Sequence, residues 1–151
     1  MIVEIAKIPP AGMRLQGEEP AECLELQDAD LAEPAGPVRY DLTVRLITGE
    51  LVVTGAVRVE MQFVCSRCGE SFKREVAEPA CAFARETSEL GACVDLTPQI
   101  REAILLAFPS YPVCRIDCAG RCPFCGGNLN RMQCDCRPPA EERWKALDGL
   151  S

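Results

Sequence analysis

The feature that most constrains this chain is its cysteine content, with eleven cysteines and no histidine in 151 residues. Eight of the cysteines stand in four closely spaced pairs, which are Cys65 and Cys68, Cys114 and Cys118, Cys122 and Cys125, and Cys134 and Cys136. An odd total does not suit a closed disulfide framework, and short spacings in a reducing compartment are typical of metal ligands. Without histidine, a zinc site in this chain must be built from thiolates, alone or with carboxylates.

The four pairs can supply two tetrahedral zinc sites. The spacing favours a C-terminal cysteine group closed by a glycine-containing loop of eight residues; its members are Cys122, Cys125, Cys134 and Cys136. The remaining pairs then form a central cysteine group of Cys65, Cys68, Cys114 and Cys118. Two alternatives to the central group stay open: no second metal is bound, or Cys114, Cys118, Cys122 and Cys125 share one cage. Zinc is the expected cofactor, although iron also occupies four-cysteine sites.

The sequence offers little support for catalysis. It contains no glycine-rich phosphate loop, no nucleophile elbow and no HExxH motif, and a four-thiolate zinc has no open position for activating water. A CxxC pair can be a redox dithiol, but a thioredoxin-like site requires a βαβ context that neither pair has. We interpret the isolated Cys23, Cys81 and Cys93 as small apolar side chains. We therefore expect that the protein is not an enzyme and that it has no catalytic residues and no small-molecule substrate.

Hydrophobic alternation predicts an antiparallel β-meander or partly open barrel. In residues 38–47, apolar side chains fall on alternate positions, as in a half-buried strand. A turn candidate follows at 48–50, and Gly55 is expected to mark a bulge. The acidic stretch 18–37 is expected to be a loop. The expected strands cover residues 2–8, 38–47, 51–53, 57–63 and 71–76.

One helix is expected to pack on this sheet, at residues 97–108. Thr97 is a good N-cap and Pro98 suits the first helical position. The predicted fold class is therefore α+β, with residues 1–110 as an antiparallel β domain carrying the packed helix. Residues 111–151 are expected to form a cysteine-rich zinc-knuckle segment with a short helix at 140–147, anchored by Trp144 and Leu147.

The charge of the chain is negative overall and unevenly distributed. A net charge of −7 argues against broad attraction to nucleic acid. Residues 18–33 carry seven acidic side chains and no basic one, whereas residues 114–137 carry four arginines. No apolar run is long enough to cross a membrane, and the N-terminus does not fit a secretory signal. We therefore expect a cytoplasmic protein without membrane contact.

Several of these residues together resemble the YceD family of large ribosomal RNA subunit accumulation proteins. The matching segments are Cys65 to Cys68, Asp95-Leu96, Arg101-Glu102, Leu105 to Ala107, Cys118 to Asn130, and Cys134 to Cys136. The resemblance implies a bacterial protein that supports accumulation or processing of large-subunit ribosomal RNA, with no catalytic residues established for the family. It also implies that the metal is a scaffold, because some family members lack the C-terminal cysteines.

Three hypotheses for function follow. The leading one is a non-catalytic, zinc-stabilised factor for large-subunit ribosomal RNA or ribosome assembly, with phosphate contacts expected from Arg67, Lys73, Arg74, Arg115, Arg121 and Arg131. The second is a protein-interaction module, in which the acidic residues 18–33 bind a basic ribosomal protein. The third is a CxxC redox or zinc-handling protein.

Overall fold

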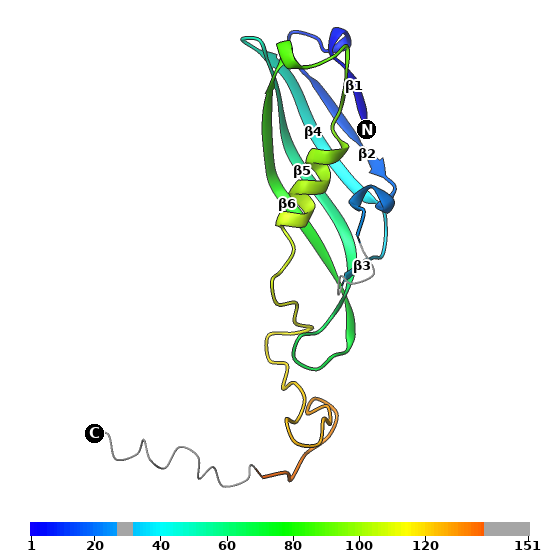
Figure 1. Ribbon diagram of the computed structural model, residues 1–151, viewed down its shortest axis with the longest axis vertical. Coiled ribbons are helices and arrows are strands. Elements are labelled where there is room, and N and C mark those ends of the chain that lie inside the picture. Colours follow the sequence, from blue (N-terminus) through cyan, green and yellow to red (C-terminus); the bar gives the residue numbers. More distant parts are fainter. Residues whose placement is uncertain (27–31, 138–151) are drawn as a thin grey trace, which may run out of the picture.

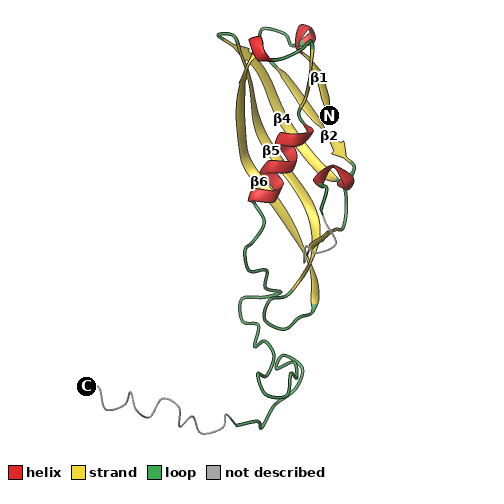
Figure 2. Cartoon of the chain, in the orientation of Figure 1, coloured by secondary structure: helices red, strands yellow, loops and turns green. Residues whose placement is uncertain are grey.

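The computed structural model describes residues 1–26 and 32–137. The predicted helix at 140–147, with Trp144 and Leu147, lies outside the described residues. Strands dominate the described part, together with one α-helix and three short 3₁₀ turns (Figures 1 and 2). In chain order, the elements are β1 (Ile2–Glu4), η1 (Ile5–Lys7), β2 (Met13–Glu19), η2 (Ala21–Leu24), β3 (Ala32–Pro34), β4 (Val38–Ile47), β5 (Glu50–Val64), β6 (Ser71–Glu86), η3 (Thr87–Glu89), β7 (Cys93–Asp95) and α1 (Thr97–Leu106). None of the helices in the described part of the chain is long and apolar enough to cross a membrane.

The strands form two open antiparallel sheets. The larger sheet has the order β2-β4-β5-β3, with β6 pairing along β5 as well, and the smaller one pairs β1 with β7. Helix α1 lies across one face of the larger sheet, over β5 and β6 (Figure 1). The predicted class is confirmed: antiparallel sheets, one packed helix and cysteine clusters towards the C-terminus.

The core lies between α1 and the sheet, and β5 contributes more buried side chains to it than any other described element. Its inward side chains are buried, because the apolar residues of β5 alternate with polar ones. They are Leu51, Val53, Val57, Val59, Met61 and Phe63. From the helix, Ile100 and Ile104 complete this core and are 1% and 0% exposed.

The bulge predicted at Gly55 is confirmed. The register between β5 and β6 shifts between Gly55 and Val57, where Gly55 pairs with Cys81 and Val57 with Glu78. Between these two pairs, the single residue Ala56 of β5 faces Pro79 and Ala80 of β6, so the extra residue lies in β6. Beyond the bulge, β6 continues to Glu86, ten residues past the predicted end at 76. Pro79 interrupts the alternation in the sequence, whereas in the sheet the bulge accommodates it.

The acidic stretch 18–37 was expected to be a loop, and this expectation is wrong for part of it. Strand β2 runs to Glu19, η2 covers Ala21–Leu24, and β3 covers Ala32–Pro34. A cross-strand ion pair stabilises the acidic end of β2, where Glu18 lies 2.9 Å from Arg39 of β4. Leu24 is completely buried, and its carbonyl accepts a hydrogen bond from the Nε of Arg101 at 2.8 Å.

Two further boundaries differ from the prediction. The first strand ends at Glu4 and gives way to η1, so the expected strand over 2–8 is too long. Helix α1 begins at Thr97, which is therefore not its N-cap, and ends at Leu106 instead of residue 108. The N-cap position is held by Leu96, and the carboxylate of Asp95 just before it accepts the backbone N–H of Thr97 at 2.9 Å.

Candidate metal centres

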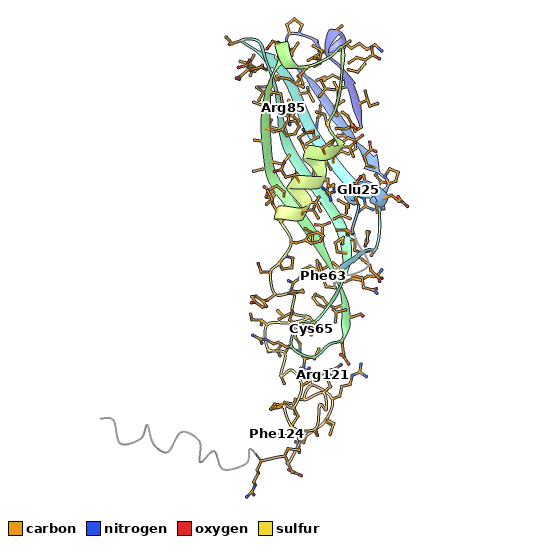
Figure 3. The ribbon with its side chains drawn as sticks, viewed as in Figure 1. Glu25, Phe63, Cys65, Arg85, Arg121 and Phe124 are labelled. Atoms are coloured by element: carbon orange, nitrogen blue, oxygen red, sulfur yellow. The ribbon has the colours of Figure 1, made fainter. Side chains whose placement is uncertain are left out.

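The central cysteine group lies where the β5–β6 hairpin meets the segment that follows α1 (Figure 3, at Cys65). Cys65 and Cys68 come from the hairpin loop, which is closed by a hydrogen bond from the Cys65 N–H to the Glu70 carbonyl at 2.9 Å. The chain then returns from the helix, and the Ser66 N–H donates to the Pro112 carbonyl at 2.8 Å. This contact brings Cys114 and Cys118 to the hairpin. All four members except Cys114 are buried.

The C-terminal cysteine group is built on a tight turn just beyond Cys118. Its first pair flanks Pro123 and Phe124, and the Gly126 N–H donates to the Cys122 carbonyl at 2.9 Å. Gly126 has a φ of +72°, which glycine adopts without steric cost. Cys122 is buried, Cys134 is half-buried, and Cys125 and Cys136 are exposed.

The sulfur atoms in each group lie within 4.8 Å of one another. In the central group, Cys65 and Cys118 are 3.9 Å apart and Cys68 and Cys114 are 3.8 Å apart. In the C-terminal group, the Cys134 sulfur lies 3.6 Å from that of Cys125 and 3.4 Å from that of Cys122. A tetrahedron with Zn–S bonds of about 2.3 Å has edges of about 3.8 Å, whereas a disulfide bond is about 2.05 Å long. The spacing therefore suits four thiolates around one ion.

Backbone amides stabilise negative charge on particular sulfur atoms. The N–H groups of Cys125 and Phe124 lower the pKa of Cys122 to about 6. Burial acts to raise the pKa of Cys65, but N–H groups of Cys68, Cys114 and Arg67 outweigh it and lower this pKa to about 6. One thiolate in each group is thus favoured at neutral pH.

The pKa values of other thiols in each group show that removing further protons is unfavourable. Burial first, and then the adjacent thiols, raise the pKa of Cys114 to about 12. The adjacent Cys134 and Cys125 raise the pKa of Cys136 to about 12. Without a cation, each group therefore resists holding four thiolates, and a bound divalent ion removes this cost. The donor set fits zinc, and the closed four-thiolate arrangement leaves no position for a reacting water.

The structure brings the eight paired cysteines together as the two groups favoured from their spacing; that each group holds zinc stays a prediction. The isolated cysteines lie outside both groups. Cys81 is buried and Cys23 is half-buried, and both pack in or against the apolar core. Cys93 is exposed.

The side chains expected to contact RNA have partners within the chain. Arg67 donates to the carbonyls of Ile116 at 3.0 Å and Cys118 at 3.3 Å, and the Arg121 Nε donates to the Cys68 carbonyl at 2.7 Å. These bonds tie the hairpin to the C-terminal segment. The other contacts are Arg74 to the Val113 carbonyl at 3.0 Å, Arg115 to Asn130 at 2.7 Å, Arg131 to Glu70 at 2.7 Å, and Lys73 to Glu60 at 3.7 Å. Their binding to RNA stays a prediction.

Sequence reasoning did not assign a role to Asn128 or Asn130. Both lie between the cysteine pairs of the C-terminal group, and Asn130 donates through Nδ2 to the sulfur of Cys118 at 3.4 Å. Their position between ligand pairs was the available signal. The candidate site therefore includes the amide of Asn130, which contacts a cysteine sulfur, and the amide of Asn128, which accepts a hydrogen bond from Asn130.

Fold and site define an antiparallel β-sheet protein with two four-cysteine groups at one end of its sheet (Figure 3). Residues 84–151 match the family model described as "Large ribosomal RNA subunit accumulation protein YceD". This match confirms the resemblance to the YceD family. The family is named for the accumulation of an RNA and not for an enzymatic reaction.

Curated relatives come from mycobacteria. Proteins of Mycobacterium bovis and Mycobacterium tuberculosis, both described as uncharacterized, are 30% identical over 121 residues, which cover 71% of this chain and 58% of theirs. An uncharacterized protein of Mycobacterium leprae is 27% identical over 142 residues, or 85% of this chain and 65% of its own. The chain thus spans about three-fifths of the length of these relatives. No solved structure matches it.

Proposed function

We propose that this chain is a non-catalytic, zinc-stabilised factor that supports the accumulation or processing of large-subunit ribosomal RNA. The observation that carries the proposal is the match of residues 84–151 to a family named for this process, in a chain with two four-cysteine groups. Closed thiolate sites suit a structural ion better than a reacting one. The proposal places the protein in the cytoplasm, where thiols stay reduced.

In this proposal, zinc holds the C-terminal segment in shape. Residues 110–137 contain no helix or strand, and their apolar side chains are largely exposed, including Tyr111 at 81% and Ile116 at 87%. A segment with so little core needs another source of stability, and structural zinc contributes roughly 10–16 kcal/mol of apparent binding energy in small folds. The sheet and the metal-held segment then present one surface to the ribosomal partner.

Elemental analysis of the purified protein tests the metal part of the proposal. We expect two zinc ions per chain, one for each group. One zinc that disappears with Cys122→Ser would support the C-terminal group alone, and no metal would overturn this part of the proposal. Cys93→Ser, at an exposed position outside both groups, should leave the content unchanged. Zinc released by mild peroxide would favour the redox or zinc-handling alternative instead.

The ribosomal role requires a test in cells. Deletion of the gene should lower the amount of mature large-subunit ribosomal RNA relative to the small-subunit RNA, and the wild-type gene should restore it. A chain with Cys65→Ser and Cys122→Ser should fail to restore it if zinc supports the active form. Unchanged ribosomal RNA after deletion would contradict the proposal.

A basic ribosomal protein is a second candidate for the direct partner. The net charge of −7 favours a basic partner, and each arginine expected to contact RNA already has a partner within the chain. Glu22 and Glu33 are exposed in the acidic region. Partners that stay bound after nuclease treatment would support protein contact, whereas loss of all partners would support contact through RNA.

A further inference from the structure

The side chain of Asn130 joins the two cysteine groups. Asn130 lies on the loop between Cys125 and Cys134, so its backbone belongs to the C-terminal group. Its Nδ2, however, donates to the sulfur of Cys118 in the central group at 3.4 Å. Cys118 is 5% exposed, so this amide contacts a buried ligand atom that water hardly reaches. A residue carried by one group therefore completes the surroundings of the other.

The hydrogen-bonding capacity of this amide is fully used, which defines its orientation. Nδ2 also donates to the Oδ1 of Asn128 at 2.8 Å. Oδ1 accepts the backbone N–H of Ala119 at 2.9 Å and an Nη2 hydrogen of Arg115 at 2.7 Å. An asparagine side chain offers two donor hydrogens and two acceptor positions. Rotating the amide by 180° would lose all four contacts, so an N–H group points at the Cys118 sulfur.

Two arginines stabilise the region where the two cysteine groups meet, because each donates a hydrogen bond to the backbone carbonyl of a cysteine in the central group. The Arg121 Nε donates to the carbonyl of Cys68 at 2.7 Å, and Arg67 donates to the carbonyl of Cys118 at 3.3 Å. The backbone N–H of Leu129 donates to the Gly120 carbonyl at 2.9 Å. Displacement of the loop carrying Asn130 would therefore disturb ligands of the central group.

We propose that Asn130 is a positioning residue that couples the two metal centres, so that a zinc ion in the C-terminal group strengthens binding in the central group. The metal ligands Cys125 and Cys134 hold both ends of the loop, and the ordered loop keeps the Asn130 amide against Cys118. The N–H group then holds the Cys118 sulfur in its position among the four sulfurs of the central group. Because coupling between binding sites is reciprocal, zinc in the central group strengthens the C-terminal group by the same factor. This inference rests on the proposed binding of metal by both groups.

The test measures the zinc affinity of the central group by competition with a chromophoric chelator. Asn130→Asp keeps an oxygen towards Ala119 and Arg115 but places a second oxygen, instead of an N–H group, against Cys118. We expect this variant to weaken zinc binding in the central group by about tenfold or more, as for other residues that orient metal ligands. Gln133→Asp is the matched control, because it adds the same charge at an exposed position of the same loop. It should leave the affinity within about twofold of wild type.

A double-mutant cycle separates coupling from a local effect. Cys134→Ser with Cys136→Ser disables the C-terminal group and should weaken the central group by a factor similar to that of Asn130→Asp. Adding Asn130→Asp to this cysteine double variant should weaken zinc binding by the central group by no more than about a further twofold. Both changes remove the same interaction, the one between Asn130 and Cys118. Cobalt substitution provides a separate readout, since an altered Cys118 thiolate changes the thiolate-to-cobalt charge-transfer band.

The outcomes separate this inference from the proposed function. Two tightly bound zinc ions with a central-group affinity that is unchanged by Asn130→Asp would overturn the coupling and leave the metal proposal standing. The coupling would also be overturned if the variant that combines Asn130→Asp with the two cysteine substitutions lost zinc affinity in the central group by the full product of the two separate fold-losses. A wild-type chain that binds no zinc would instead refute the metal proposal itself.

Discussion

Replacing Gly55 with alanine tests the close backbone contact between β4 and β5 beside the bulge of the β5–β6 hairpin. Gly55 has a φ of +153°, a conformation that L side chains rarely adopt. A β-carbon placed on it would lie 2.1 Å from the carbonyl oxygen of Asp41 and 2.8 Å from the Cα of Leu42, both in β4. These are backbone atoms of a paired strand, so the collision cannot be relieved by a side-chain rotation. Strands β4 and β5 would have to separate by more than an ångström locally, or β5 would have to change its backbone angles.

The expected loss of stability follows from these two costs. An unfavourable backbone conformation for a non-glycine residue costs about 1–3 kcal/mol, and overpacking in a closely packed region costs about 1–3 kcal/mol. The alanine also restricts the unfolded chain, which offsets about 0.4–1 kcal/mol. We therefore expect Gly55→Ala to lower the free energy of unfolding by about 1–6 kcal/mol.

The measurement is urea unfolding of the zinc-saturated protein, followed by circular dichroism of the sheet. Gly36→Ala is the control, because no described heavy atom beyond its chain neighbours lies within 4 Å of a β-carbon placed there. It should change the free energy of unfolding by less than about 1 kcal/mol. A Gly55→Ala protein that unfolds at the same urea concentration as wild type would refute the close approach of β4 to Gly55.

Three further predictions concern the cysteine groups. Cys122→Ser should remove one zinc ion per chain and Cys65→Ser the other, as measured by elemental analysis; an unchanged content in either variant would show that its group is not a metal site. Because the pKa of Cys114 and that of Cys136 are each raised to about 12, zinc must displace protons from these thiols at neutral pH, so zinc affinity in chelator competition should fall as the pH is lowered. The fall should become steeper below about pH 6, where Cys65 and Cys122, whose pKa values are lowered to about 6, also take up protons; affinity independent of pH would contradict thiolate ligation. Arg121→Ala should lower the free energy of unfolding by about 1–2 kcal/mol, because the carbonyl of Cys68 loses its donor. Arg85→Ala, at an exposed position on β6, is the control and should leave the midpoint of thermal unfolding nearly unchanged. Equal midpoints for the Arg121→Ala and Arg85→Ala proteins would show that the hydrogen bond from Arg121 to the Cys68 carbonyl does not stabilise the fold.

The arginines of the cysteine-rich segment illustrate how structure alters an interpretation from composition. Three of the four arginines within residues 114–137 are predicted from the sequence to contact RNA phosphate. In the structure, Arg121 and Arg67 contact backbone carbonyls across the junction of the two groups, which gives them a structural role. Arg131 is 74% exposed even while paired with Glu70, so its proposed contact with a phosphate would have to displace this carboxylate.

The sequence by itself determined the features that depend on local periodicity and spacing. Alternation over residues 38–47 and 57–63 predicted strands that lie within β4 and β5, because a pleated chain exposes alternate residues to opposite faces. Gly55 predicted the bulge, and the short cysteine spacings predicted which thiols can converge. The helix was predicted from its apolar spacing and Pro98, with its end misplaced by two residues.

Only the tertiary structure decided the features that depend on partners distant in the sequence. Residues 13–19 form a strand because β4 offers hydrogen bonds and because Arg39 offsets the charge of Glu18, neither of which the acidic stretch reveals alone. Strand β6 continues past Pro79 because β5 is long enough to pair with it. The contact between Asn130 and Cys118 requires the loop of one cysteine group to fold over the other. Local patterns therefore specified the two cysteine groups and most strands, whereas long-range packing determined how the two cysteine groups are joined.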